Sequence, residues 1–129
     1  MNIFVTDPDP IKSAQVLPDK HIVKMPLETC QMLAIVCSLK WGHGFGTLPK
    51  ANGEPYKTTT GAFRNHPCTI WANSFVNNWR WLLAHGFALC DEYALRYGKP
   101  HTCFNTLQAA NEILPCADPQ GRSGKGPTP

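Results

Sequence analysis

Apolar residues repeat at helical spacing from the N-terminal third of the chain onward. The first stripe advances by three or four residues at a time, which is the pattern of one buried helix face. Asp9-Pro10 and Pro18-Asp19 are both typical of a helix N-terminus, since each combines a proline with an acidic residue at the first turn. We therefore expect a short helix over about 10–17 and a longer one over about 19–40. The stripe of the longer helix is Ile22, Pro26, Cys30, Leu33 and Cys37.

Pro26 lies in the middle of that longer helix. A proline inside a helix removes one backbone hydrogen bond and its ring collides with the carbonyl one turn back. The sequence therefore predicts that the helix kinks or restarts at Pro26.

The second half of the chain is also helical by its spacing. Apolar residues trace a face from Pro67 to Tyr97, Gly98 is a helix stop, and Asn73-Ser74 is a point of interruption. The regular spacing of three tryptophans indicates that at least two of them belong to the core. A last helix is expected over 104–114. The tryptophans are Trp71, Trp79 and Trp81, and the other members of the face are Ile70, Phe75, Leu82, Leu83, Phe87, Cys90, Tyr93 and Ala94.

No segment alternates as a half-buried strand does, so the expected fold is all-α, a small single-domain helical bundle. Residues 1–118 form the expected single helical domain, and residues 119–129 a flexible C-terminal tail. Between the two helical halves, Trp41 to Asn65 holds five glycines, and we expect one long irregular loop there.

The six cysteines are expected to be buried free thiols, because no signal-peptide pattern precedes them. Metal binding is the sharper alternative. His66-Pro-Cys68 and His101-Thr-Cys103 are two H-x-C pairs, but no C-x-x-C accompanies them, so no metal and no cofactor are predicted. No apolar run reaches the ~20 residues of a membrane span.

Positive charge is concentrated in the middle of the chain. The net charge is +3, but residues 20–80 hold seven bases and two acids, a local balance of +5. This distribution favours a polyanionic partner such as nucleic acid, against the alternative of an ordinary solvated surface. The bases are Lys20, Lys24, Lys40, Lys50, Lys57, Arg64 and Arg80, and the acids are Glu28 and Glu54.

Glu28 is the candidate for chemistry. At helical spacing it shares one side with His21 and Lys24. The ordinary interpretation is a surface ion pair with Lys24. The alternative is a lone carboxylate lining a pocket that a charged partner enters.

The segment FRNHPCTIW places Arg64, Asn65 and His66 at a helix N-terminus. Backbone N–H groups there favour anions, so a phosphate could bind. Simple capping by Asn65 or His66 is an equal alternative. His85 and His101 are expected to be structural.

Three blocks of the sequence stand out: P-D-K-H-x-x-K-x-x-x-E-T-x-Q-x-L from Pro18, N-H-P-x-x-x-W from Asn65, and L-x-x-x-G-x-A-L-C-D-E-Y-x-x-R-Y-G from Leu82. Together they resemble the pyrimidine-dimer DNA glycosylase family, the phage-type base-excision enzymes and their relatives. The resemblance implies a compact helical fold and a glycosylase with AP lyase activity on ultraviolet-damaged DNA. It also implies that the N-terminal α-amine attacks the sugar C1′ to form an imine, after which β-elimination nicks the strand.

In that family one glutamate is the other essential group, and Glu28 matches its position. The nucleophile is then the amine of Met1, or of Asn2 after processing. Phage-type enzymes carry arginines beside the glutamate, where this chain has Leu27 and Gln31. Other residues are therefore expected to contact the DNA: Lys20, His21, Lys24, Lys57, Arg64, Asn65, His66 and Arg80.

The expected partner is double-stranded DNA containing damaged pyrimidines, bound by a monomer in the cytoplasm of a bacterial cell or a virus-infected host cell. Two other functions stay open. One is a non-catalytic DNA-binding module on the same helical scaffold. The other is a zinc-dependent regulator using His66, Cys68, His101 and Cys103.

Overall fold

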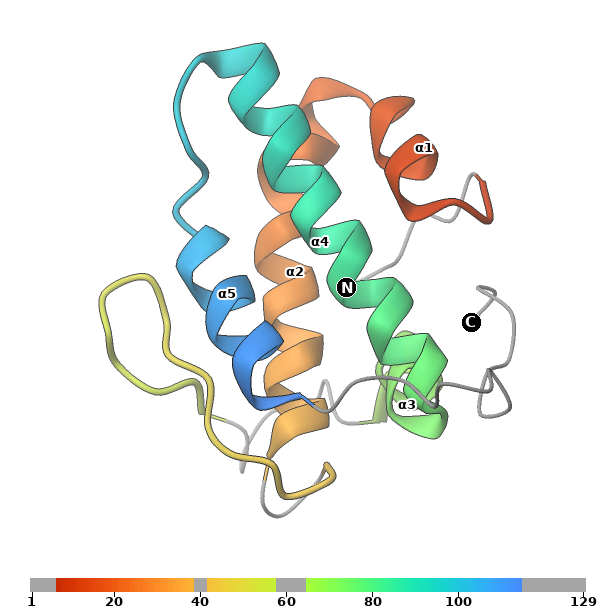
Figure 1. Cartoon of the computed structure of the whole chain (residues 1–129), viewed down its shortest axis with the longest axis vertical. Helices are drawn as coiled ribbons and strands as arrows, with labels where there is room; N and C mark the ends of the chain where they lie inside the picture. The colour runs from red at the N-terminus through yellow and green to blue at the C-terminus, as the bar shows by residue number, and fades with distance from the viewer. Residues whose placement is uncertain (1–6, 39–41, 58–64, 115–129) are drawn as a thin grey trace.

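The computed structural model describes residues 7–38, 42–57 and 65–114, and these contain five helices and no strand (Figure 1). The all-α expectation is confirmed. The helices are α1 (Pro10–Gln15), α2 (Asp19–Cys37), α3 (Pro67–Ser74), α4 (Val76–Tyr97) and α5 (Phe104–Ile113).

The two long helices, α2 and α4, pack against each other at the centre, with α1 and α5 on opposite sides of α4 (Figure 1). They run antiparallel, because Arg96 in the last turn of α4 forms an ion pair with Asp19 at the start of α2, at 2.9 Å. The expected apolar stripe of α2 is buried along its whole length.

Pro26 lies inside one continuous helix, so of the two predicted outcomes the restart is wrong and the kink stays a prediction. Proline removes a single hydrogen bond, and packing of the buried face outweighs that local cost, since Met25, Pro26 and Cys30 are all buried. The helix ends at Cys37, and Ser38 caps it in an extended conformation. The expected end at Lys40 falls outside the described residues.

The interruption predicted at Asn73-Ser74 is confirmed. α3 ends at Ser74, Phe75 is extended, and α4 begins at Val76. Ile70 and Phe75, both expected on the apolar face, are 53 % and 41 % exposed, and Phe75 is the extended residue at the break. Trp71 and Trp79 are buried and Trp81 is half-buried, which confirms the expectation that at least two are core residues.

The described part of the loop, residues 42–57, packs back against the end of α2. A Cβ at Gly42 would collide with the carbonyl oxygens of Ile35 and Val36, so this approach requires glycine. One isolated bridge joins Pro49 to Pro55, and Leu48 is buried in the core. This part of the loop is therefore irregular, but it is held against the end of α2 and by the buried side chain of Leu48.

Five cysteines are buried free thiols, as expected, and Cys116 falls outside the described residues. None of the helices in the described ranges is long and apolar enough to cross a membrane.

Candidate active site

Glu28 lies near the middle of α2 and is 9 % exposed. His21, two turns earlier, is half-buried, while Lys24 and Lys20 are exposed. Because α2 is continuous through Pro26, the spacing of three and four residues keeps His21, Lys24 and Glu28 on one side. A buried carboxylate with a base one turn away differs from the solvated surface ion pair of the ordinary interpretation.

The N-terminal arm, by which we mean the residues up to the start of α1 at Pro10, is bound to α4 through the main-chain carbonyls of Pro8 and Pro10. Trp81 donates its Nε1–H to the Pro8 carbonyl at 2.7 Å, and His85 donates from Nδ1 to the Pro10 carbonyl at 3.0 Å. The His85 ring stacks on Trp81, and its burial lowers the pKa of the imidazole, so the neutral ring acts as the donor. Met1 and Asn2 fall outside the described residues.

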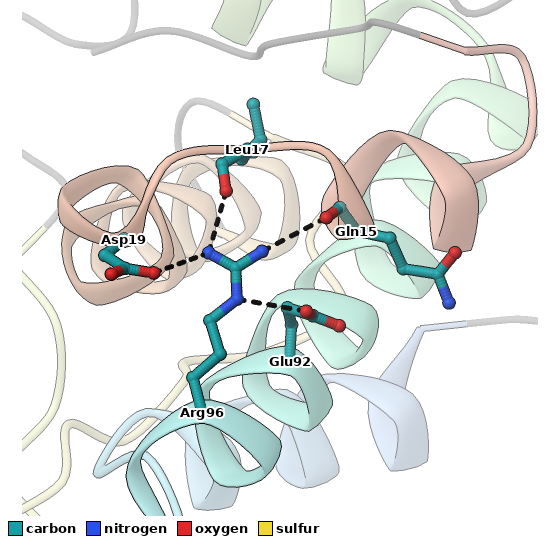
Figure 2. A network of polar contacts seen from close by, with 5 residues as sticks. All are labelled: Gln15, Leu17, Asp19, Glu92 and Arg96. Carbon is teal, nitrogen blue, oxygen red and sulfur yellow. Dashed lines mark hydrogen bonds and ion pairs between the residues drawn. The ribbon is translucent and has the colours of Figure 1, made fainter.

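Arg96 completes this attachment at the other end of α4 (Figure 2). Its guanidinium donates to the carbonyls of Leu17 at 2.8 Å and Gln15 at 3.1 Å. It also pairs with Asp19 at 2.9 Å and with Glu92 at 3.0 Å. The rigid fork of donors suits this role, since one side chain satisfies two carbonyls where α1 ends and α2 begins.

The expected DNA-contacting bases do not gather at one point. Lys20 lies in the first turn of α2, whereas Arg80 is exposed near the start of α4. Because the two helices are antiparallel, these ends are separated by the sixteen residues from Arg80 to Arg96, or about 24 Å of helix. Lys57 is exposed on the loop. The basic residues are thus spread along the length of the bundle, and Arg64 falls outside the described residues.

His66 is the N-cap of α3, and its Nδ1 accepts a hydrogen bond from the Cys68 backbone N–H at 3.1 Å. The two alternatives for this segment were a phosphate site and helix capping by Asn65 or His66, and the structure contains the cap made by His66. Asn65 beside it is exposed.

His101 makes the same kind of bond to the Cys103 N–H, at 3.0 Å. Both H-x-C pairs are therefore local turns. No three metal-ligating side chains come together among the described residues, so the zinc hypothesis has no assembled site there.

A cavity of about 460 Å³ lies beside α2, on the face next to Glu28. Leu27 and Gln31, which the resemblance places where the phage-type enzymes have arginines, both line it. Glu28 itself does not, so the expectation that it lines a pocket is not met by this cavity. The cavity could not be predicted from the helical spacing, because its other walls come from the distant loop and from residues 102–103. The remaining lining residues are Ala34, Ile35, Lys50, Ala51, Asn52, Tyr56, Lys57, Thr102 and Cys103.

A family model described as pyrimidine dimer DNA glycosylase matches residues 1–105. The chain belongs to this family. No curated protein and no solved structure matches the sequence.

Membership of the pyrimidine dimer DNA glycosylase family implies glycosylase activity and binding to damaged DNA. The matched residues include Glu28, the arm and all the expected DNA contacts, and they end in the first turn of α5. The polar side chains of α4 that hold the arm were not predicted from the sequence as functional residues. Their partners are main-chain carbonyls, which leave no mark in a sequence.

Proposed function

We propose that this protein excises pyrimidine dimers and then nicks the strand as an AP lyase, with its N-terminal α-amine as nucleophile and Glu28 as the acid–base group. The observation that carries the proposal is the buried position of Glu28 on a helix whose neighbouring turns carry bases. Attack of the amine on C1′ of the damaged nucleotide displaces the base and forms an imine. Loss of a proton from C2′ then breaks the C3′–O bond.

The chemistry suits these two groups. An α-amine has a pKa of about 8, so a useful fraction is unprotonated near neutral pH. The imine carries positive charge beside the opened sugar, and a carboxylate there stabilises that charge and transfers protons.

The reach of the arm is compatible with this arrangement. The ion pair between Arg96 and Asp19 gives a common reference point on the two antiparallel helices. From it, Trp81 lies about 22 Å along α4 and Glu28 about 14 Å along α2. Pro8, which is bound to Trp81, is therefore within about 10 Å of Glu28 along the bundle axis. The seven residues before Pro8 span up to about 25 Å. The length of chain before Pro8 is accordingly sufficient to cover this axial separation.

For DNA binding we propose Lys20, Lys24, Lys57, Arg64 and Arg80 as phosphate contacts, with His21, Asn65 and His66 as polar contacts around them. Their spread along the bundle suits a duplex lying along its length. Substitution of any one of the five bases by Gln should weaken the salt dependence, reducing the magnitude of the slope of log affinity against log salt concentration by about 0.9. The reduction should be equal for damaged and undamaged DNA.

Borohydride trapping tests the chemistry. The full chain is mixed with duplex DNA that contains a cyclobutane dimer or an abasic site, and covalent complexes are counted after reduction. Glu28→Gln should abolish nicking while retaining much of the binding. Glu112→Gln, at an exposed carboxylate on α5, is the matched control and should trap as the wild type does. Selective acetylation of the N-terminal amine should prevent trapping.

A covalent complex that persists after acetylation would overturn the assignment of the nucleophile. Salt-dependent binding that is indifferent to damage and to Glu28, without trapping, would instead establish the non-catalytic DNA-binding module.

A further inference from the structure

Three buried thiols from three different helices converge in the core. Cys30 belongs to α2, Cys90 to α4, and Cys103 is the N-cap residue of α5. The Cys30 thiol donates a hydrogen bond to the Cys103 carbonyl oxygen, at 3.8 Å. Two cysteines that are 73 positions apart in sequence are therefore in contact, through the thiol of one and the main chain of the other.

Access distinguishes these thiols. Among the described cysteines, Cys103 is the one that lines the 460 Å³ cavity, together with Lys50 and Lys57. Cys30 is fully buried behind it, at 0 % exposure. A small reagent entering the cavity meets Cys103 first and has Cys30 immediately beyond.

The surroundings of Cys103 favour its thiolate. His101 is held by two bonds, from the Cys103 N–H to Nδ1 at 3.0 Å and from Nε2 to the Val23 carbonyl at 2.9 Å. The neighbouring Cys30 thiol, followed by the contact with His101, lowers the pKa of Cys103 below that of an ordinary thiol.

The other thiols are held protonated. The contact with Cys103 and burial raise the pKa of Cys30, and burial raises that of Cys90 to about 12. The titratable groups that interact with Cys103 are Cys30, Tyr56, Cys90 and His101, and Lys50 and Lys57 line the same cavity.

We propose that Cys103 is a peroxide-reactive thiol and Cys30 its resolving partner, so that oxidation in the cavity closes a disulfide between α2 and the start of α5. This modification site is independent of the proposed DNA chemistry. Its ligand class is a small peroxide, for which the cavity supplies entry and two nearby cations.

The reaction balances in two steps. The Cys103 sulfur attacks one oxygen of hydrogen peroxide, the O–O bond breaks, and the departing hydroxide takes a proton to become water. Cys30 then attacks the sulfenic sulfur, the S–O bond breaks, and the second hydroxide leaves with the Cys30 proton. Two thiols are oxidised by two electrons in total, and one peroxide is reduced to two waters.

The test is hydrogen peroxide treatment of the full chain in the absence of other thiols, followed by intact-mass measurement and tandem mass spectrometry of tryptic peptides. Wild-type protein should lose two hydrogen atoms and contain a Cys30–Cys103 linkage that dithiothreitol reverses. Cys30→Ala should stop at a sulfenic acid on Cys103, which dimedone captures. Cys103→Ser should give neither product.

Cys37→Ser is the matched control, because Cys37 is equally buried on α2 but lies outside the cluster. It should form the disulfide at the wild-type rate, and circular dichroism checks that each variant is folded. A linkage that instead uses Cys90, or oxidation of Cys37 as fast as that of Cys103 in the wild type, would overturn the proposal.

Alkylation by iodoacetamide, followed peptide by peptide, gives a second readout that needs no variant. The rate at Cys103 should fall much less between pH 8 and pH 6 than that of an ordinary thiol, which loses about 100-fold over that interval. A 100-fold loss at Cys103 would contradict a stabilised thiolate.

Discussion

The two flanks of α4 are built differently. On one flank, α5 inserts Leu107 and Ala110 into the large apolar core, where both are 0 % exposed. On the other flank, the six-residue α1 contributes only Ala14 to a small separate cluster. That flank is instead bound through carbonyls of its main chain by side chains of α4. A short helix with little apolar surface is thus fixed by polar contacts to its backbone.

Leu107→Ala attacks the apolar flank and should have the largest effect. Removing a fully buried leucine side chain in a close-packed core is expected to lower the free energy of unfolding by about 2–5 kcal/mol. Urea denaturation followed by circular dichroism measures this loss. A change below about 1 kcal/mol would mean that the α5 flank does not depend on its core contacts.

Arg96→Met attacks the polar flank. It removes donors to Gln15 and Leu17 while keeping much of the side-chain length, and should cost about 1–2 kcal/mol. Hydrogen exchange should accelerate over 9–19 and stay unchanged over 104–113, because the two flanks are attached separately. Equal acceleration of exchange in both segments would show that the two flanks of α4 are not attached separately.

His85 gives the polar flank a pH dependence. Folding lowers its pKa below the ordinary 6.5, so the unfolded chain binds more protons than the folded chain as the pH falls through 6.5. Its contribution to stability is therefore complete above pH 6.5 and declines at lower pH. His85→Asn, which retains a donor near the Pro10 carbonyl, should flatten the slope of unfolding free energy between pH 7 and pH 5. An unchanged slope would contradict this assignment.

Asp19→Asn should have the smallest effect. The ion pair with Arg96 has a carboxylate side chain that is 73 % exposed, so its loss is expected to change stability by less than about 0.5 kcal/mol. Comparison with Arg96→Met in the same urea experiment separates the carbonyl contacts from the charge pair. A loss as large as that of Arg96→Met would show that the charge, and not the carbonyls, holds this corner.

Helix positions could be predicted because they depend on local signals, and the break at Ser74 and the cap at His66 are examples. The continuity of α2 through Pro26 could not, since packing against α4 decides whether one missing hydrogen bond interrupts a helix. The candidate acid, Glu28, was found by its neighbours in one helix. The cavity and the Cys30–Cys103 contact join residues far apart in sequence, which no spacing rule brings together.

The arm is attached to α4 by hydrogen bonds to its main-chain carbonyls and not to its side chains. Pro8 and Pro10 offer their carbonyls to Trp81 and His85, and any residue in their place would offer the same acceptor. A substitution at Pro8 or Pro10 therefore leaves the acceptor for Trp81 or His85 in place.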